Sequence, residues 1–208
     1  MSDAPIDALE ALGDSSDAGD VRVALAQRYS YVVPDAHSLE VLRTLEPIIE
    51  IGAGTGYWAS RLIAEGVDIV AFDQAPPDGD RPNRYHAPSP TWTEVRHGDQ
   101  TVLRDYSDRT LFLCWAPLFS SLGDSLTYYA GSTVACIGDG GHRTTRLQSL
   151  NADFTCVSVH PVHAIDPAPD AVATLSVWRR RNATASPSVR DGVERPDRLR
   201  GSVVASSA

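Results

Sequence analysis

The sequence predicts an α/β protein with a three-layer, doubly wound fold, in which helices cover both faces of a seven-stranded, mostly parallel sheet. Three observations lead to this prediction. Short apolar, strand-like segments alternate with helix-like segments along most of the chain. The first strand-like segment, 48–51, runs directly into a glycine-rich turn. The last two are separated by a turn rich in proline and aspartate, which predicts an antiparallel terminal hairpin.

Two short helices are expected before the first strand, at residues 21–25 and 38–45. Asp35 is placed to cap the second helix through its carboxylate, and Pro47 is placed to end it. The chain then enters the apolar strand 48–51, whose side chains are expected to be buried on both faces of the sheet.

The turn after this strand carries glycines at positions 52, 54 and 56, and the acidic Glu50 precedes them. Gly52, Gly54 and Gly56 have no Cβ atom, so the backbone can turn sharply and approach a ligand closely. The dinucleotide fingerprint G-x-G-x-x-G would need a glycine where Tyr57 stands. The negative charge of Glu50 is also unsuited to a pyrophosphate, so the turn favours a cationic or zwitterionic ligand.

The run Glu50-Ile-Gly-Ala-Gly-Thr-Gly56 resembles motif I of the class I methyltransferases, which bind S-adenosylmethionine through its amino acid part at this turn. Over roughly residues 28–180 the chain is also similar to a group of small methyltransferase-like proteins that carry Glu-Ile-Gly-Ala-Gly-Thr-Gly-Tyr-Trp-Ala and Leu-Phe-Leu-Cys-Trp-Pro-Pro elements. The resemblance implies S-adenosylmethionine as the cofactor, with Tyr57 and Trp58 among the residues that contact it.

Two tyrosines, Tyr29 and Tyr31, lie between the two predicted helices. An aromatic pair of this kind is typical either of packing or of a lid. In class I methyltransferases the segment before motif I folds over the cofactor, so the resemblance implies that both tyrosines gate the site.

A helix at 57–65, closed by Gly66, and a strand at 67–73 are expected next. The strand ends in Asp73, 21 residues after Gly52. A carboxylate at this place can accept both ribose hydroxyls, and NAD enzymes use the same device. Asp73 therefore indicates an adenosine cofactor in general.

The segment 74–90 is rich in proline and glycine and is predicted to be a loop in place of a helix. A short strand at 93–96 follows, and then Asp99. In the resembling family an acidic residue here contacts the adenine edge, and an exposed Gly-Asp turn is the alternative.

The apolar run 110–115 predicts a buried parallel strand that ends at Trp115. The resemblance implies that this strand end lies beside the transferable methyl group, and Trp115 is among the residues expected to bind the cofactor. Amino methyltransferases often carry Asn/Asp-Pro-Pro-Tyr there. This chain has Cys114-Trp-Ala-Pro-Leu118 instead, which lacks the polar residue and the final aromatic residue and puts nitrogen methylation of that style in doubt.

The remaining predicted elements are a helix at 121–129 and strands at 132–137, 155–160 and 173–179. Asp139 and His142 follow the fifth strand, in a glycine-rich segment. An acceptor hydroxyl would need a base of this kind, and an amine must lose a proton before or during attack. Asp139 and His142 are therefore the candidate catalytic residues, with an ordinary loop role as the alternative.

Length and composition predict one globular domain, at residues 19–181 of the 208-residue chain. Residues 1–18 are expected to be an acidic disordered tail, and 182–208 a disordered tail rich in Ala, Ser, Pro and Arg. The formal net charge is −9, which makes a nucleic acid an unfavourable partner. No apolar run is long enough to span a membrane, so a cytoplasmic protein is expected, without a membrane partner. The oligomeric state is left open.

The chain contains no lysine, which excludes Schiff-base chemistry and a Walker A phosphate site. The composition also suggests a bacterial source. Three cysteines at wide intervals are expected to be buried small hydrophobic residues. His160 and His163 stand on either side of Pro161 with no third ligand nearby in the sequence, so no metal site is predicted.

The sequence therefore favours an S-adenosylmethionine-dependent methyltransferase that acts on an amine, or less readily a hydroxyl, of a small molecule or peptide, in a biosynthetic pathway. A non-catalytic S-adenosylmethionine-binding or scaffold protein is the first alternative. An NAD-dependent oxidoreductase is the remote one, because the glycine spacing is wrong and a lysine-free chain cannot supply a Tyr-x-x-x-Lys relay.

Overall fold

The computed structural model describes residues 18–83, 85, 86, 89–115, 121–139, 150–165 and 173–181. The helices include α2 (Ala18–Arg28), α3 (Ala36–Arg43), α4 (Tyr57–Ala64), α5 (Ser121–Tyr128) and the 3₁₀ helix η1 (Gln100–Asp105). The strands are β1 (Val32–Val33), β2 (Ile48–Ile51), β3 (Ile69–Asp73), β4 (Arg96–His97), β5 (Thr110–Cys114), β6 (Thr133–Asp139), β7 (Phe154–Ala164) and β8 (Ala173–Arg180). The two predicted tails lie outside the described residues, apart from Ala18, which begins α2.

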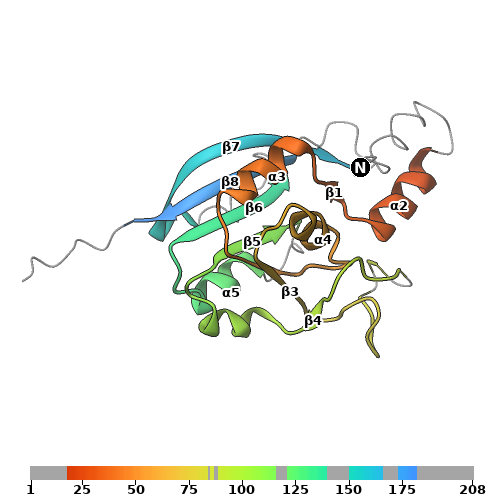
Figure 1. The fold of residues 1–208 in the computed structure, drawn as a ribbon, viewed down its shortest axis with the longest axis horizontal. Helices are drawn as coiled ribbons and strands as arrows, with labels where there is room; N and C mark the ends of the chain where they lie inside the picture. Colours follow the sequence, from red (N-terminus) through yellow and green to blue (C-terminus); the bar gives the residue numbers. More distant parts are fainter. Residues whose placement is uncertain are drawn as a thin grey trace, which may run out of the picture.

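One sheet contains all the described strands, in the order β1-β7-β8-β6-β5-β2-β3-β4 (Figure 1). Strands β4, β3, β2, β5 and β6 pair in parallel, whereas β8 runs antiparallel to both of its neighbours, β6 and β7. This arrangement confirms the predicted α/β sheet with its antiparallel terminal hairpin. The seven predicted strands correspond to β2 to β8. The two-residue β1, which pairs with the end of β7, was not predicted.

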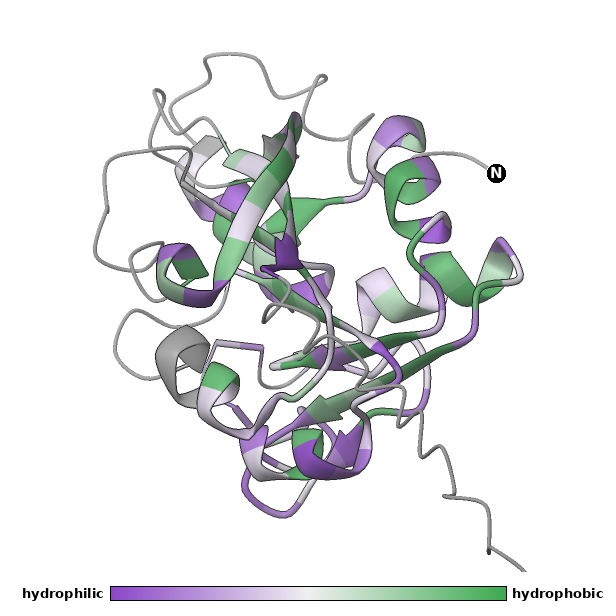
Figure 2. Ribbon diagram, turned by 90° about the vertical axis from the view of Figure 1, so that its left-hand side faces the viewer, coloured by the Kyte–Doolittle hydropathy of each residue, from purple (hydrophilic) through white to green (hydrophobic). Residues whose placement is uncertain are grey.

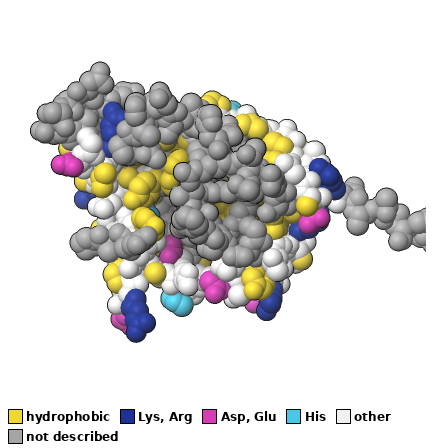
Figure 3. All heavy atoms as spheres, turned by 180° about the vertical axis from the view of Figure 1, so that it is seen from behind, with side chains coloured by type: hydrophobic (Ala, Val, Ile, Leu, Met, Phe, Trp, Pro, Cys, Tyr) yellow, Lys and Arg dark blue, Asp and Glu magenta, His cyan; other side chains and the backbone are white. Residues whose placement is uncertain are grey.

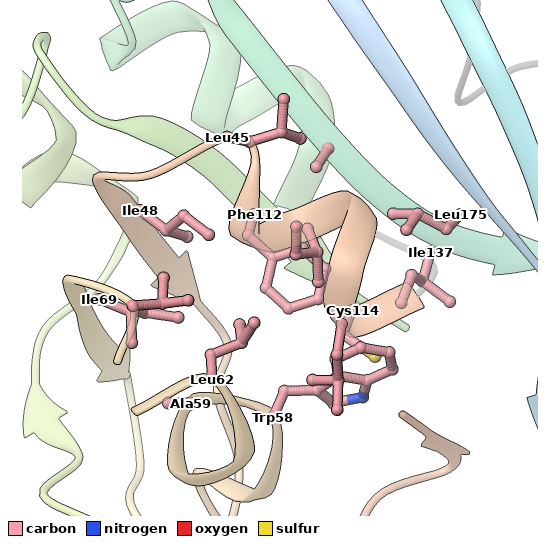
Figure 4. Close-up of a cluster of buried hydrophobic side chains, with 14 of the residues drawn as sticks. Leu45, Ile48, Trp58, Ala59, Leu62, Ile69, Phe112, Cys114, Ile137 and Leu175 are labelled. Atoms are coloured by element: carbon pink, nitrogen blue, oxygen red, sulfur yellow. The ribbon is translucent and has the colours of Figure 1, made fainter. Parts of the chain in front are cut away.

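Helices cover both faces of the sheet and bury a separate apolar core on each, which confirms the three layers. On one face α3 and α4 pack against the strands, and Figure 4 shows Trp58 and Leu62 of α4 directed toward Phe112 of β5. On the other face η1 and α5 cover a second core that includes Leu103, Leu111 and Tyr129. The central strands are correspondingly apolar along their length (Figure 2). The alternation of side chains along each strand therefore sets the two cores.

Local sequence signals fixed several boundaries correctly. Asp35 is the N-cap of α3, and its Oδ1 accepts a hydrogen bond from the Ser38 amide at 2.6 Å. Helix α4 ends at Ala64, one residue before its predicted end, with Glu65 as its C-cap, and Gly66 follows with φ +83°, as expected for a glycine after a helix. No helix within the described ranges has both the length and the apolarity needed to cross a bilayer.

Two strand predictions were imprecise. The segment predicted at 93–96 forms a strand only at β4, because Thr93 and Val95 pack over Gly56 instead of pairing with β3. Strand β7 extends beyond its predicted end and continues through Pro161. Proline is tolerated there because β1 pairs with β7 only at His163 and Ala164, so the edge beside Pro161 is not paired with β1.

The cysteines are free, but they are not all buried. Cys114 is buried and Cys136 is half-buried, whereas Cys156 is exposed, so the expectation of three buried thiols was wrong for Cys156. Cys156 lies at an irregularity of β7, where the pairing register with β8 shifts between Cys156 and Ser158.

Candidate functional site

The carboxyl ends of three neighbouring parallel strands, β2, β3 and β5, bring the predicted site residues to one edge of the sheet. Ile51 pairs with Phe72, and Glu50 pairs with Phe112, so the turn after β2, the end of β3 and the end of β5 are adjacent. In open α/β sheets this edge is where ligands bind. The structure therefore brings the glycine turn, Asp73 and Trp115 to the same edge.

The three glycines of the turn all have positive φ, at +74°, +55° and +73°, but they have different surroundings. A Cβ on Gly52 would meet nothing within 4 Å, and this glycine is exposed. A Cβ on Gly54 would lie 2.6 Å from Nε2 of His86, and a Cβ on Gly56 would lie 2.7 Å from Cγ2 of Val95. Only Gly52 thus faces open space, while Gly54 and Gly56 accommodate the loop that precedes β4.

Asp73 holds the turn in place. Its carboxylate is only 4% exposed and accepts the Gly54 amide through Oδ2 and the Ala75 amide through Oδ1, both at 2.8 Å. The carbonyl of Phe72 also accepts the Gly52 amide at 2.8 Å. Each carboxylate oxygen can accept a further hydrogen bond, so Asp73 retains the capacity to bind ligand hydroxyls.

Glu50 is a buried carboxylate on the face of β2 that α4 covers, and it is 1% exposed. Burial, with the nearby charge of Asp73, raises the pKa of Glu50 to about 8, although a hydrogen bond from the Ala59 amide acts in the opposite direction. Ala59 lies in the first turn of α4, whose N-cap, Gly56, has no side chain to cap the helix. Glu50 therefore serves as a cap for α4 from the neighbouring strand.

The second oxygen of Glu50, Oε2, has no hydrogen-bond partner among the described residues. A buried carboxylate oxygen without a partner is costly, and a cation placed beside it would favour the ionised form. The environment of Glu50 thus fits a ligand that brings a positive charge or several hydrogen-bond donors to the glycine turn.

Tyr29 and Tyr57 belong to an aromatic cluster with Trp92, beside the turn. The Tyr29 ring stacks on Trp92 at 5.0 Å and meets Tyr57 edge-on at 5.1 Å. The cluster is anchored by the backbone, because the Trp92 amide donates to the Thr55 carbonyl and its indole N–H donates to the Arg28 carbonyl, both at 2.8 Å. These contacts give Tyr29 and Tyr57 a packing role, and the proposed contacts with a cofactor stay a prediction.

Trp58 lies inside the core, 2% exposed. Its indole N–H donates to the Val32 carbonyl at 2.8 Å, and its ring meets Phe112 edge-on at 5.5 Å (Figure 4). Trp58 thereby ties α4 to β1 and β5. Tyr31 is half-buried, and its ring meets that of His86 at 5.8 Å.

Asp99 caps η1. Its Oδ1 accepts hydrogen bonds from the Thr101 amide at 2.9 Å and from the Thr101 hydroxyl at 2.6 Å. Both hydrogen bonds lower the pKa of Asp99, and the one from the hydroxyl has the larger effect. The Gly98 amide donates to the Asp73 carbonyl at 3.0 Å, so the Asp99 backbone begins close to the end of β3. Contact of Asp99 with adenine stays a prediction.

The acceptor side of the site is only partly described. Trp115 follows β5 with φ +49°, in the left-handed region, and its amide donates to the Ile137 carbonyl at 3.0 Å. Asp139 is the last residue of β6, paired with Ala173, and its side chain lies outside the described part of the structure. His142 also lies outside it. The catalytic roles of Asp139 and His142 stay predictions.

Sequence reasoning did not identify His86, which lies in the loop between β3 and β4. Its Nδ1 is 3.1 Å from the Gln27 carbonyl, and burial lowers its pKa. No spacing rule in the sequence points to this residue, since its position depends on how the proline-rich loop folds back over the turn.

Another histidine contact lies away from this edge, where Nε2 of His37 is 3.0 Å from Nδ1 of His160. The described residues contain no group of three or more His, Cys, Asp or Glu side chains arranged to hold a metal ion. The side chain of His163, the other member of the sequence pair, lies outside the described residues.

Comparison with known proteins gives structural likeness at low identity. No protein-family model matches the chain, and no curated protein matches it. A structure concerned with the conversion of a disulfide bond into a thioacetal group during echinomycin biosynthesis is 13% identical, with a TM-score of 0.49, and the match covers 81% of this chain and 95% of that one.

Two further structures are similar at the same level. The N-methyltransferase NodS from Bradyrhizobium japonicum WM9 is 14% identical, with a TM-score of 0.44, and the match covers 80% of this chain and 98% of that one. TrmN from Thermus thermophilus is 15% identical, with a TM-score of 0.45, and the match covers 70% of this chain and 48% of that one. The strand order and the reversed β8 show an α/β, Rossmann-like fold with a mostly parallel sheet. Likeness at these identities does not assign a reaction, a cofactor or an acceptor to this chain.

Proposed function

We propose that this chain binds S-adenosylmethionine at the turn after β2 and transfers its methyl group to an acceptor. The observation that carries the proposal is the Glu50 side chain, buried beside the glycine turn with an oxygen that has no partner among the described residues. S-adenosylmethionine brings an ammonium group to such a turn. Its binding would supply the positive charge that this carboxylate needs in order to be ionised.

The described residues fit the two halves of the cofactor. Gly52, two residues after Glu50 in the chain, leaves open space at the turn for the amino acid part. Asp73, at the end of the adjacent strand, has acceptor capacity left for ribose hydroxyls. The cofactor supplies a methyl group already activated by a positively charged sulfur, so the main task of the protein is to orient the acceptor behind that group.

The same geometry argues against a dinucleotide. A pyrophosphate would bind at the N-terminus of α4, where free amides and the helix dipole favour an anion. Here the Ala59 amide of that first turn donates to the Glu50 carboxylate, and Gly56 is covered by the Val95 side chain. A diphosphate would therefore find the Ala59 amide already used by the Glu50 carboxyl group.

As acceptor we propose an amine, and less readily a hydroxyl, of a small molecule or peptide in a biosynthetic pathway. The net charge of −9 is unfavourable for a nucleic acid backbone. Figure 3 shows the molecule from the side opposite to Figure 1. On the described part of this face, acidic and arginine side chains are interspersed and form no continuous basic surface. Asp139 and His142 are the candidates to take a proton from the acceptor.

Calorimetric titration with S-adenosylmethionine, S-adenosylhomocysteine and NAD tests the cofactor. The proposal predicts micromolar binding of S-adenosylmethionine and S-adenosylhomocysteine and no binding of NAD. It also predicts that Glu50→Gln and Asp73→Asn each weaken binding of the first two ligands at least tenfold. Glu65→Gln is the matched control, because it removes one glutamate charge at an exposed position after α4. Binding of NAD alone, or no binding of either methyl-cycle ligand, would overturn it.

Methyl transfer needs a separate measurement, because a protein that binds S-adenosylmethionine but transfers no methyl group would give the same calorimetric result. Release of S-adenosylhomocysteine during incubation with panels of small amines, peptides and hydroxylated compounds would be followed by mass spectrometry. Turnover with any amine, reduced in Asp139→Asn or in His142→Ala, would support the transferase. Tight binding with no turnover across the panels would favour the non-catalytic alternative.

A further inference from the structure

His86 lies directly over the glycine turn, from the loop that joins β3 to β4. Its Nε2 is 2.6 Å from the position that a Cβ would take on Gly54, and the Gly54 amide itself donates to Oδ2 of Asp73 at 2.8 Å. The charge of Asp73 is close enough to affect His86. The imidazole, Gly54 and the Asp73 carboxylate therefore form one small group at the end of β3.

The hydrogen bond on the other side of the ring fixes which nitrogen carries the proton. Nδ1 of His86 lies 3.1 Å from the Gln27 carbonyl, which can only accept, so Nδ1 is the donor. Burial favours the neutral ring by lowering its pKa. Nε2 is then left with a lone pair, so the atom next to Gly54 is a hydrogen-bond acceptor.

The ring is held in this orientation by contacts with segments far away in the sequence. The Tyr31 ring meets it edge-on at 5.8 Å. The following part of the loop is fixed by Trp92, whose amide donates to the Thr55 carbonyl and whose indole N–H donates to the Arg28 carbonyl. An acceptor fixed in this way loses little freedom when a ligand binds.

We propose that His86 is a cofactor-binding residue, and that its Nε2 accepts a hydrogen bond from one ribose hydroxyl while Asp73 accepts one from the other. The inference rests on the proposed S-adenosylmethionine site and names a second ribose acceptor in it. Each Asp73 oxygen already accepts one backbone amide, from Gly54 or from Ala75, and can accept one more hydrogen bond, so an acceptor on His86 would allow the two vicinal hydroxyls to be divided between two side chains.

Two substitutions separate this role from a structural one. His86→Asn keeps an N–H near the place of Nδ1, and so can keep the hydrogen bond to the Gln27 carbonyl, but has no atom at the place of Nε2. His86→Gln reaches the place of Nε2 with a carbonyl oxygen and so restores the acceptor. The probe is S-adenosylhomocysteine in calorimetry, and the ligand-free unfolding temperature of each variant reports whether the loop is still held.

We expect His86→Asn to unfold at nearly the wild-type temperature and to bind S-adenosylhomocysteine about tenfold more weakly, as expected when a ligand hydroxyl loses its partner in a buried site. His86→Gln should bind at least threefold more tightly than His86→Asn. The inference is overturned if wild type binds and His86→Asn binds within twofold of it. If wild type does not bind S-adenosylhomocysteine at all, the proposed function fails, and this inference fails with it.

Discussion

Replacing Glu50 with glutamine should remove a pH-dependent cost from the folded state. Burial raises the pKa of Glu50 from 4.5 to about 8 in the folded protein, whereas the unfolded chain exposes this carboxylate to water. Between pH 4.5 and about pH 8, Glu50 stays protonated in the folded state but is ionised in the unfolded chain. The stability of the wild type therefore falls as the pH rises across this window and levels off above pH 8.

The size of the effect follows from the width of the window. Each unit of pKa difference is worth about 1.4 kcal/mol, so ionisation of Glu50 in the unfolded chain destabilises the wild type by about 3 kcal/mol at pH 7. Glutamine resembles the protonated form, and its carbonyl can still accept the Ala59 amide. Between pH 5 and pH 8 we expect wild type to lose about 3 to 4 kcal/mol relative to Glu50→Gln.

Urea and thermal unfolding of both proteins over pH 5 to 9 would measure this difference. For a chain of this length about 1 kcal/mol shifts the unfolding temperature by roughly 2 to 4 °C, so at pH 8 Glu50→Gln should unfold roughly 8 °C or more above wild type. Glu65→Gln, the exposed control, should parallel wild type at every pH. If the stability difference between wild type and Glu50→Gln changed by less than about 1 kcal/mol from pH 5 to pH 8, the Glu50 carboxyl group would not have the raised pKa in the folded protein.

Three further predictions concern the turn, the proton balance and the thiols. Gly54→Ala should destabilise the protein by about 2 to 3 kcal/mol. The left-handed backbone conformation costs an alanine about 1 to 2 kcal/mol at Gly52 or at Gly54, and at Gly54 the added Cβ would also lie 2.6 Å from Nε2 of His86. Gly52→Ala should lower the free energy of unfolding by only about 1 kcal/mol and weaken S-adenosylmethionine binding. Equal free energies of unfolding for the Gly52→Ala and Gly54→Ala variants would contradict this difference. Binding of S-adenosylmethionine at pH 7 should release a proton from Glu50, seen as a dependence of the calorimetric enthalpy on buffer, and proton uptake would be the wrong sign. A thiol reagent should modify Cys156 in the native protein but Cys114 only after unfolding, as followed by mass spectrometry of peptides.

Much of the fold could be predicted because its signals are local. The Asp35 cap and the run into the glycine turn each depend on a few neighbouring residues. Strand β1 was missed because two residues carry no periodicity, and it exists through pairing with β7, more than a hundred residues away. The strand predicted at 155–160 stops before Pro161, whereas β7 continues through this proline, which its edge position permits.

The sequence predicted that the candidate site residues lie at strand ends, and the structure places them there. Glu50 and Asp73 were identified from the spacing of acidic residues around the turn, and the parallel register brings them together. The different surroundings of Gly52 and Gly54 were not predictable, since they depend on the long loop after β3. The same loop places His86, which no pattern in the sequence indicates.

The most direct test of the central claim compares S-adenosylhomocysteine with the same molecule lacking its α-amino group, in wild type and in Glu50→Gln. If Glu50 pairs with the ligand's positive charge, loss of the amino group should weaken binding to wild type at least tenfold and binding to Glu50→Gln less than twofold. Equal loss in both proteins would mean that the buried carboxylate does not recognise this ligand, and would contradict the account of the site.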